Sequence, residues 1–194
     1  VVDLPEPLPE PVAAMDVFEQ KATGGKLDLL FVVDNSDSMF MDHVDKKLVK
    51  RFKNFLDTLA GVDYQIGVTT TDLSGKPFAG WDGRLDFLGD THYKKKEKIL
   101  TPATKKGSDL LLDTLFRQET LECRFYNGDV ELKFGCGSNY EQSLGAVVAA
   151  INRRHTDNKG FFRDDADLAA IAISDENEGS DDGDPNATKP ADVL

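Results

Sequence analysis

The sequence predicts an α/β fold with a mostly parallel central sheet, and three consecutive segments support this prediction. Residues 27–33 form a nearly continuous apolar run, which suits a central strand covered on both faces. Residues 42–59 carry apolar side chains at helical spacing, which is typical of an amphipathic helix, and Gly61 ends it. Residues 64–71 are rich in β-branched side chains and predict a second strand. A strand, a helix and a strand in this order make a βαβ unit.

Irregular stretches alternate with further elements in the rest of the chain. Residues 73–107 are rich in Gly, Pro and Asp and predict loops with one short strand pair. The lysine-rich run at 94–98 within them is most simply a solvated face. Residues 108–122 and 140–154 predict helices, and residues 168–173 predict a third buried strand.

The N-terminal residues differ in composition from the rest of the chain. Four prolines within residues 5–11 exclude a helix or a sheet interior and predict an extended, semi-rigid tether, and residues 12–20 predict a short edge strand. We therefore divide the chain into a tether at residues 1–24 and a domain at residues 25–194. The chain starts without Met and without an apolar signal stretch, as expected of a processed mature protein or of a trimmed chain.

Composition and charge exclude several functional classes. The length of 194 residues is that of one domain, and 40% hydrophobic residues are enough for a globular core. The 35 acidic and 23 basic residues give a net charge of −12, which argues against binding to nucleic acid or to an anionic membrane surface. The sequence contains no apolar run of about eighteen residues that would span a bilayer.

The chain has two cysteines, Cys123 and Cys136, which are too few for a disulfide scaffold or a four-thiolate zinc site. Asn127 and Gly128 between them are a strong turn signal, and a hairpin there would bring the two sulfurs within bridging range. We favour one disulfide, which would place the protein outside the cytoplasm. Two free, partly buried thiols of a cytosolic protein are the alternative.

Oxygen-bearing side chains lie where the predicted strands end. Asp34, Ser36 and Ser38 follow the first strand in an Asp-x-Ser-x-Ser spacing, Ser138 precedes a helix, and Asp175 follows the third strand. Ligands of open α/β sheets bind at the carboxyl ends of the strands, and carboxylates with hydroxyls are hard ligands that suit Mg²⁺ or Mn²⁺. The first group alone fits a helix N-cap cluster equally well. The three loops together favour a cation site.

These segments resemble the von Willebrand factor A domain, also called the integrin I-like domain. The first motif of that family is similar to residues 29–39, its second-loop Thr position is Ser138 here, and its third-loop Asp position is Asp175. The resemblance implies a Rossmann-like, doubly wound, mostly parallel sheet with helices on both faces. It also implies a metal-ion-dependent adhesion site that holds a divalent metal, Mg²⁺ above all with Mn²⁺ or Ca²⁺ as alternatives. The implied contacts, direct or through water, come from Asp34, Ser36, Ser38, Ser138 and Asp175.

A bacterial subgroup of these domains, often attached to secreted or lipid-anchored surface proteins, is the most similar. Its members commonly carry a cysteine just before the second metal loop, as Cys136 is here, which supports the disulfide. The resemblance implies an extracytoplasmic location (periplasmic, cell-surface or secreted), with a lipid anchor through a processed N-terminus as an option. A complete domain of this family continues past its third metal loop, so we expect the C-terminal part of the domain to be missing from this chain.

Six of the ten residues at 175–184 are acidic and none is basic. A solvated acidic loop, whose field raises the cation concentration beside the predicted site, explains them best. A second, dedicated calcium loop is the alternative, although the segment lacks the glycine position and terminal Glu of an EF-hand.

We expect a metal-dependent adhesion or protein-interaction module, and not an enzyme. The partner would be a protein or surface ligand that presents an Asp or Glu carboxylate to an open coordination position. Metal-assisted hydrolysis with Glu176 or Asp37 as base is an alternative, but the sequence has no nucleophile elbow, His-Glu-x-x-His pair or P-loop. A structural scaffold with an unoccupied metal site is the other alternative. The three histidines stand in polar contexts and are predicted at the surface: His43, His92 and His155.

Overall fold

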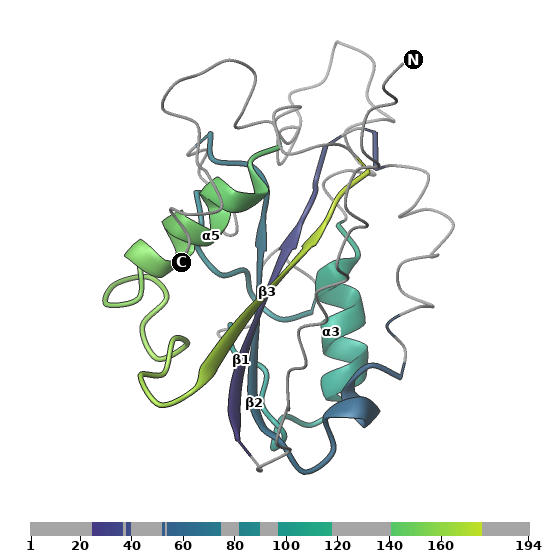
Figure 1. Ribbon diagram of the computed structural model, residues 1–194. Helices are drawn as coiled ribbons and strands as arrows, with labels where there is room; N and C mark the ends of the chain where they lie inside the picture. The colour runs from purple at the N-terminus through teal and green to yellow at the C-terminus, as the bar shows by residue number, and fades with distance from the viewer. Residues whose placement is uncertain are drawn as a thin grey trace, which may run out of the picture.

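The computed structural model describes residues 25–36, 38–39, 52, 54–74, 82–89, 97–117 and 141–175. Their strands form one parallel sheet in the order β2-β1-β3, with helices packed against it (Figure 1). The elements, in chain order, are β1 (Lys26–Val33), a 3₁₀ helix (Leu56–Leu59), β2 (Asp63–Thr70), α3 (Gly107–Leu115), α5 (Ser143–Asn152) and β3 (Asp167–Ile173). The predicted α/β class and parallel strand pairing are confirmed.

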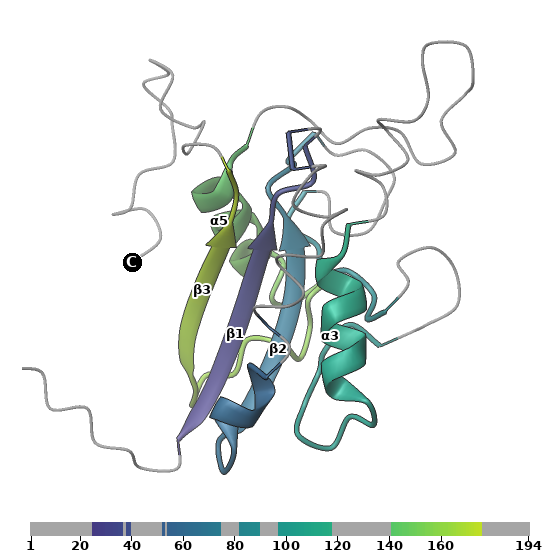
Figure 2. The ribbon, with the colours of Figure 1, turned by 90° about the vertical axis from the view of Figure 1, so that its right-hand side faces the viewer.

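Strand β1 lies in the middle of the sheet, as its continuous apolar run predicts (Figure 2). Leu29 pairs with Ile66 of β2 on one side and with Ala169 of β3 on the other. All three strands point the same way, so their carboxyl ends meet at one edge of the sheet. Each strand begins one residue before its predicted start, because the apolar pattern marks the buried part of a strand and not its exposed first residue.

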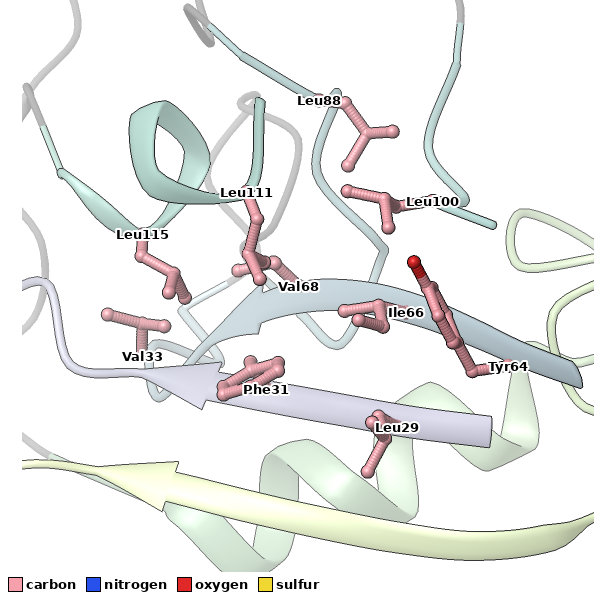
Figure 3. Close-up of a cluster of buried hydrophobic side chains, with 10 residues drawn as sticks. All are labelled: Leu29, Phe31, Val33, Tyr64, Ile66, Val68, Leu88, Leu100, Leu111 and Leu115. Atoms are coloured by element: carbon pink, nitrogen blue, oxygen red, sulfur yellow. The ribbon is translucent and has the colours of Figure 1, made fainter. Parts of the chain in front are cut away.

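One face of the sheet packs against α3. Leu29, Phe31 and Val33 of β1 meet Leu111 and Leu115 of α3 in a buried cluster, which Figure 3 shows together with the side chains of β2. Phe31 is fully buried at the centre of this cluster. The odd-numbered residues of β1 therefore face α3, as the two-residue repeat of a strand requires.

The opposite face packs against α5. Leu30 and Val32 of β1 contact Ala146, Val147 and Ala150 of α5 through a second buried cluster, so α3 and α5 lie on opposite sides of β1 (Figure 1). The helix predicted over 140–154 is confirmed as α5, with shorter ends. Small residues on α5 let it approach the sheet closely.

Strand β3 exists as predicted, but its predicted burial is wrong. Its side chains alternate between exposed and half-buried, and Leu168 is 44% exposed. Ala169, Ile171 and Ile173 lie against the α3-side cluster, whereas α5 contacts β1 and β2. β3 lies at the edge of the described sheet, and the side chains on its other face, Leu168, Ala170 and Ala172, are exposed.

Two irregular regions differ from the predictions. Within residues 73–107, the described part shows an isolated antiparallel bridge between Ile66 of β2 and Leu100 instead of a separate strand pair. Helix α3 ends at Leu115, because Phe116 is extended, so the helix is shorter than the predicted 108–122 over its described part. No helix in the described segments is long and apolar enough to cross a membrane.

Several predicted features lie wholly or largely outside the described residues. Of the helix predicted over 42–59, only the end is described: it is 3₁₀ at Leu56–Leu59, and Gly61 follows with φ +85°. The tether at 1–24, the lysines at 94–96, the cysteine hairpin with Cys123 and Cys136, and the acidic residues beyond Asp175 lie outside.

Candidate metal centre at the carboxyl edge of the sheet

The candidate site begins where β1 and β3 end side by side. The backbone N–H of Asp34 donates to the carbonyl of Ile173 at 2.9 Å, which continues the β1–β3 ladder one residue past β1. Asp34 therefore lies next to the segment that carries Ser174 and Asp175. The parallel pairing brings together side chains about 140 residues apart in sequence.

A chain of hydrogen bonds joins four of the five predicted ligands. The Asp34 carboxylate accepts from the backbone N–H of Ser36 at 2.7 Å. The hydroxyls of Ser36 and Ser38 lie 2.8 Å apart, and the Ser38 hydroxyl donates to Asp175 Oδ1 at 3.0 Å. The structure thus brings Asp34, Ser36, Ser38 and Asp175 into one cluster. The sequence reasoning missed Ser174, whose hydroxyl donates to Asp34 Oδ2 at 2.7 Å.

Burial divides this cluster into an inner and an outer part. Asp34 and Ser36 are buried, with 0% and 1% of their surface exposed, whereas Ser38 and Asp175 are exposed. The inner pair is held in place by the core and by the bond between the Asp34 carboxylate and the Ser36 amide. The outer pair leaves the cluster open to solvent on one side.

Strand β2 also ends at this edge, in a run of buried polar side chains. Thr69, Thr70, Thr71 and Asp72 are all 0% exposed. The N–H of Thr71 donates to the Val33 carbonyl of β1 at 3.2 Å. The hydroxyl of Thr71 is buried and has no hydrogen-bond partner among the described residues. The sequence reasoning assigned this segment to a strand and gave its hydroxyls no role, although three consecutive threonines followed by Asp are an unusual strand end.

The donor set fits a hard divalent cation. Two carboxylates and two hydroxyls supply oxygen ligands only, and few carboxylates leave room for water, as Mg²⁺ prefers. A buried hydroxyl without a partner beside the cluster is a further sign that a polar ligand belongs there. The described residues contain no group of three or more His, Cys, Asp or Glu that could hold a metal. A site built from two carboxylates and hydroxyls does not form such a group.

Other predicted residues are not placed here or lie away from the cluster. Ser138, the fifth predicted ligand, and the predicted bases Asp37 and Glu176 lie outside the described residues, as do His43 and His92. His155 is exposed, as predicted. It lies in the turns that follow the end of α5.

No protein-family model matches the sequence, and no curated protein is significantly similar to it.

Proposed function

We propose that this protein is a divalent-metal-dependent adhesion or protein-interaction module, and not an enzyme. The observation that carries the proposal is the hydrogen-bonded chain from Asp34 through Ser36 and Ser38 to Asp175 at the carboxyl edge of a parallel sheet. These four residues and Ser138 would hold the metal, Mg²⁺ in the first place with Mn²⁺ or Ca²⁺ as alternatives. A metal bound there would supply an open coordination position for an Asp or Glu carboxylate of a protein or surface ligand.

The fold proposed with this function is a doubly wound sheet of the von Willebrand factor A type. Its support is the order of motifs along the chain and the packing of α3 and α5 on opposite faces of β1. The same proposal includes an extracytoplasmic location and a bridge between Cys123 and Cys136. A bridge at Cys136 would restrain the loop that carries Ser138, two residues further on.

The residues of the cluster have different tasks in this proposal. Asp34 and Ser36 are buried and held by neighbouring backbone, so they act as fixed oxygen ligands. Ser174 donates to Oδ2 of Asp34 and so orients its carboxylate, as outer-shell partners do in metal sites. Ser38 and Asp175 are exposed and face the side from which a partner approaches. Specificity for a partner would then depend on the surface residues around Ser38 and Asp175.

One observation favours a second candidate, a structural scaffold without metal. The hydroxyls of Ser36, Ser38 and Ser174 each have a partner within the cluster, so the network is satisfied by protein groups alone. The scaffold predicts that the protein binds no divalent cation and that chelators leave its stability unchanged. Metal binding therefore separates the two candidates.

The test uses Asp175, because its carboxylate is exposed and its replacement perturbs folding little. Isothermal titration of the full chain with Mg²⁺ and Mn²⁺ should show one site, and Asp175→Asn should weaken it by about 10-fold or more. Asp164→Asn removes an exposed carboxylate outside the cluster and is the matched control, with no expected change. A wild-type chain that binds no cation at millimolar concentration would favour the scaffold. Equal losses of cation affinity in the two variants would show that the cation is held only by nonspecific attraction to negative charge.

A further inference from the structure

The hydroxyl of Thr71 is a further polar group at this edge of the sheet, and it is buried. Thr71 follows the last residue of β2 and is 0% exposed, and its hydroxyl has no hydrogen-bond partner among the described residues. Buried hydroxyls are nearly always bonded, because leaving one unbonded is unfavourable. A buried hydroxyl without a protein partner therefore indicates a ligand or a water molecule.

The register of the sheet places Thr71 beside Asp34. Val33 pairs with Thr70, and the Thr71 N–H bonds to the Val33 carbonyl, so the next pair in register is Asp34 with Thr71. Asp34 still bonds to Ile173 of β3, which shows that the ladder continues through it. Side chains at paired positions of neighbouring strands lie on the same face of the sheet. Thr71 and Asp34 are therefore at neighbouring positions on one face of the sheet.

This face is the one that α5 covers. Leu30 and Val32 of β1 point toward α5, and Asp34 continues that alternation. The backbone N–H of Gln142, the residue before α5, donates to the Thr71 carbonyl at 3.2 Å. Thr71 thus lies between Asp34 and the start of α5. The segment that leads to α5 carries Ser138, four residues before Gln142.

The hydroxyl of Thr69 can be compared with that of Thr71, because it is equally buried but hydrogen-bonded. Thr69 lies two residues earlier, within β2 and on the same face. Its hydroxyl donates to the Arg84 carbonyl at 2.9 Å, so it holds the segment after β2 to the strand. Within the described part of the chain, one hydroxyl of this face is therefore hydrogen-bonded, and the other, at the position beside Asp34, is not.

We propose that Thr71 is a positioning residue of the metal site, which would extend that site to the end of β2. Its hydroxyl would hydrogen-bond a water molecule that completes the coordination of the cation, so all three strands would contribute to the site. This inference rests on the proposed function, because it requires that a cation binds at Asp34.

The test compares Thr71→Val with Thr69→Val, two changes that each replace a buried hydroxyl by a methyl group of similar size. Titration of the full chain with Mg²⁺ measures the affinity, and thermal unfolding in EDTA measures the stability without metal. Thr71→Val should weaken Mg²⁺ binding by about 10–100-fold, as the loss of an outer-shell partner does, and should keep or raise the Tm in EDTA. Thr69→Val should lower the Tm and leave the affinity unchanged. Thr71→Ser retains the hydroxyl and should bind Mg²⁺ within a few-fold of wild type.

The outcomes separate this inference from the proposed function. If the wild-type chain binds no Mg²⁺, both are wrong. If the wild type binds and Thr71→Val binds equally well, the metal site stands and Thr71 has no part in it. If Thr71→Val lowers the Tm in EDTA as Thr69→Val does, with unchanged affinity, the hydroxyl serves the packing and the inference is overturned.

Discussion

Replacing Arg117 by Met should destabilise the protein strongly, because it breaks a buried ion pair. Arg117 Nη1 lies 2.6 Å from Asp86 Oδ2, and the two side chains are only 2% and 1% exposed. The backbone N–H of Asp86 donates to the Val68 carbonyl of β2 at 2.7 Å, and Arg117 lies just after α3. The pair therefore fastens the end of α3 to the segment that covers the outer edge of β2.

The size of the effect follows from the burial of the pair. The Met variant keeps the apolar stem of Arg117 but leaves the Asp86 carboxylate in the interior without the guanidinium. Losing one partner of a buried pair costs about 3–5 kcal/mol. For a chain of 150–250 residues, 1 kcal/mol corresponds to about 2–4 °C, so the Tm should fall by about 6–20 °C. Denaturant unfolding followed by circular dichroism gives the free energy directly.

Lys26→Met is the matched control, because Lys26 pairs with Asp165 at the surface, where both side chains are well exposed. It should cost no more than about 1 kcal/mol. Adding Asp86→Leu to Arg117→Met should recover part of the lost stability, since an apolar pair needs no compensating charge. Similar small losses for the Arg117 and Lys26 variants would refute the reasoning, as would a double variant less stable than Arg117→Met.

Two further predictions concern a turn and an acid-sensitive carboxylate. Gly83 has φ +84°, and an added Cβ would lie 2.6 Å from α5, whereas Gly61 has φ +85° with nothing within 4 Å. Gly61→Ala should therefore cost only the backbone strain of about 1–2 kcal/mol, and Gly83→Ala clearly more; equal Tm losses would contradict this. Burial raises the pKa of Asp82, but the hydrogen bond from Arg84 and the charge of Arg153 outweigh it and lower that pKa. The stabilisation is present above the unfolded-state pKa of about 3.9 and is lost as the pH falls through the lower folded pKa. When the pH falls from about 4 to about 2, the Tm of Asp82→Asn should therefore decrease less than the Tm of the wild type. Parallel Tm profiles of the two proteins would exclude this role of Asp82.

The strands could be predicted well because their signal is local. The apolar run at 27–33 needs cover on both faces, and β1 has that cover in the middle of the sheet, between α3 and α5. The helical spacing in 140–154 likewise marks the face of α5 that packs on the sheet. The apolar residues of β1 themselves form the core, whereas on α5 the small residues Ala146 and Ala150 form it together with Val147.

The environment of β3 and the buried ion pair could not be predicted, because they depend on distant parts of the chain. An apolar run such as 168–173 has the same sequence pattern in a central strand as at an edge, so its exposure depends on which segments pack against it. Asp86 and Arg117 are 31 residues apart, and charged residues are by default expected at the surface. Their pairing follows from the path between β2 and α3, which no local pattern encodes.

The candidate site lies between these two cases. Asp34 and Asp175 could be proposed from sequence because parallel strands force their carboxyl ends to one edge, so polar residues after each strand must meet. Thr71 could not be proposed from the sequence, because the strand propensity of β-branched residues already explains a Thr at the end of a strand. Its hydroxyl gains meaning only when the register sets it beside Asp34 and burial leaves it without a partner among the described residues. A sequence motif can therefore name candidate ligands whose residue type is unusual for a strand, whereas a Thr that strand propensity already explains requires the register.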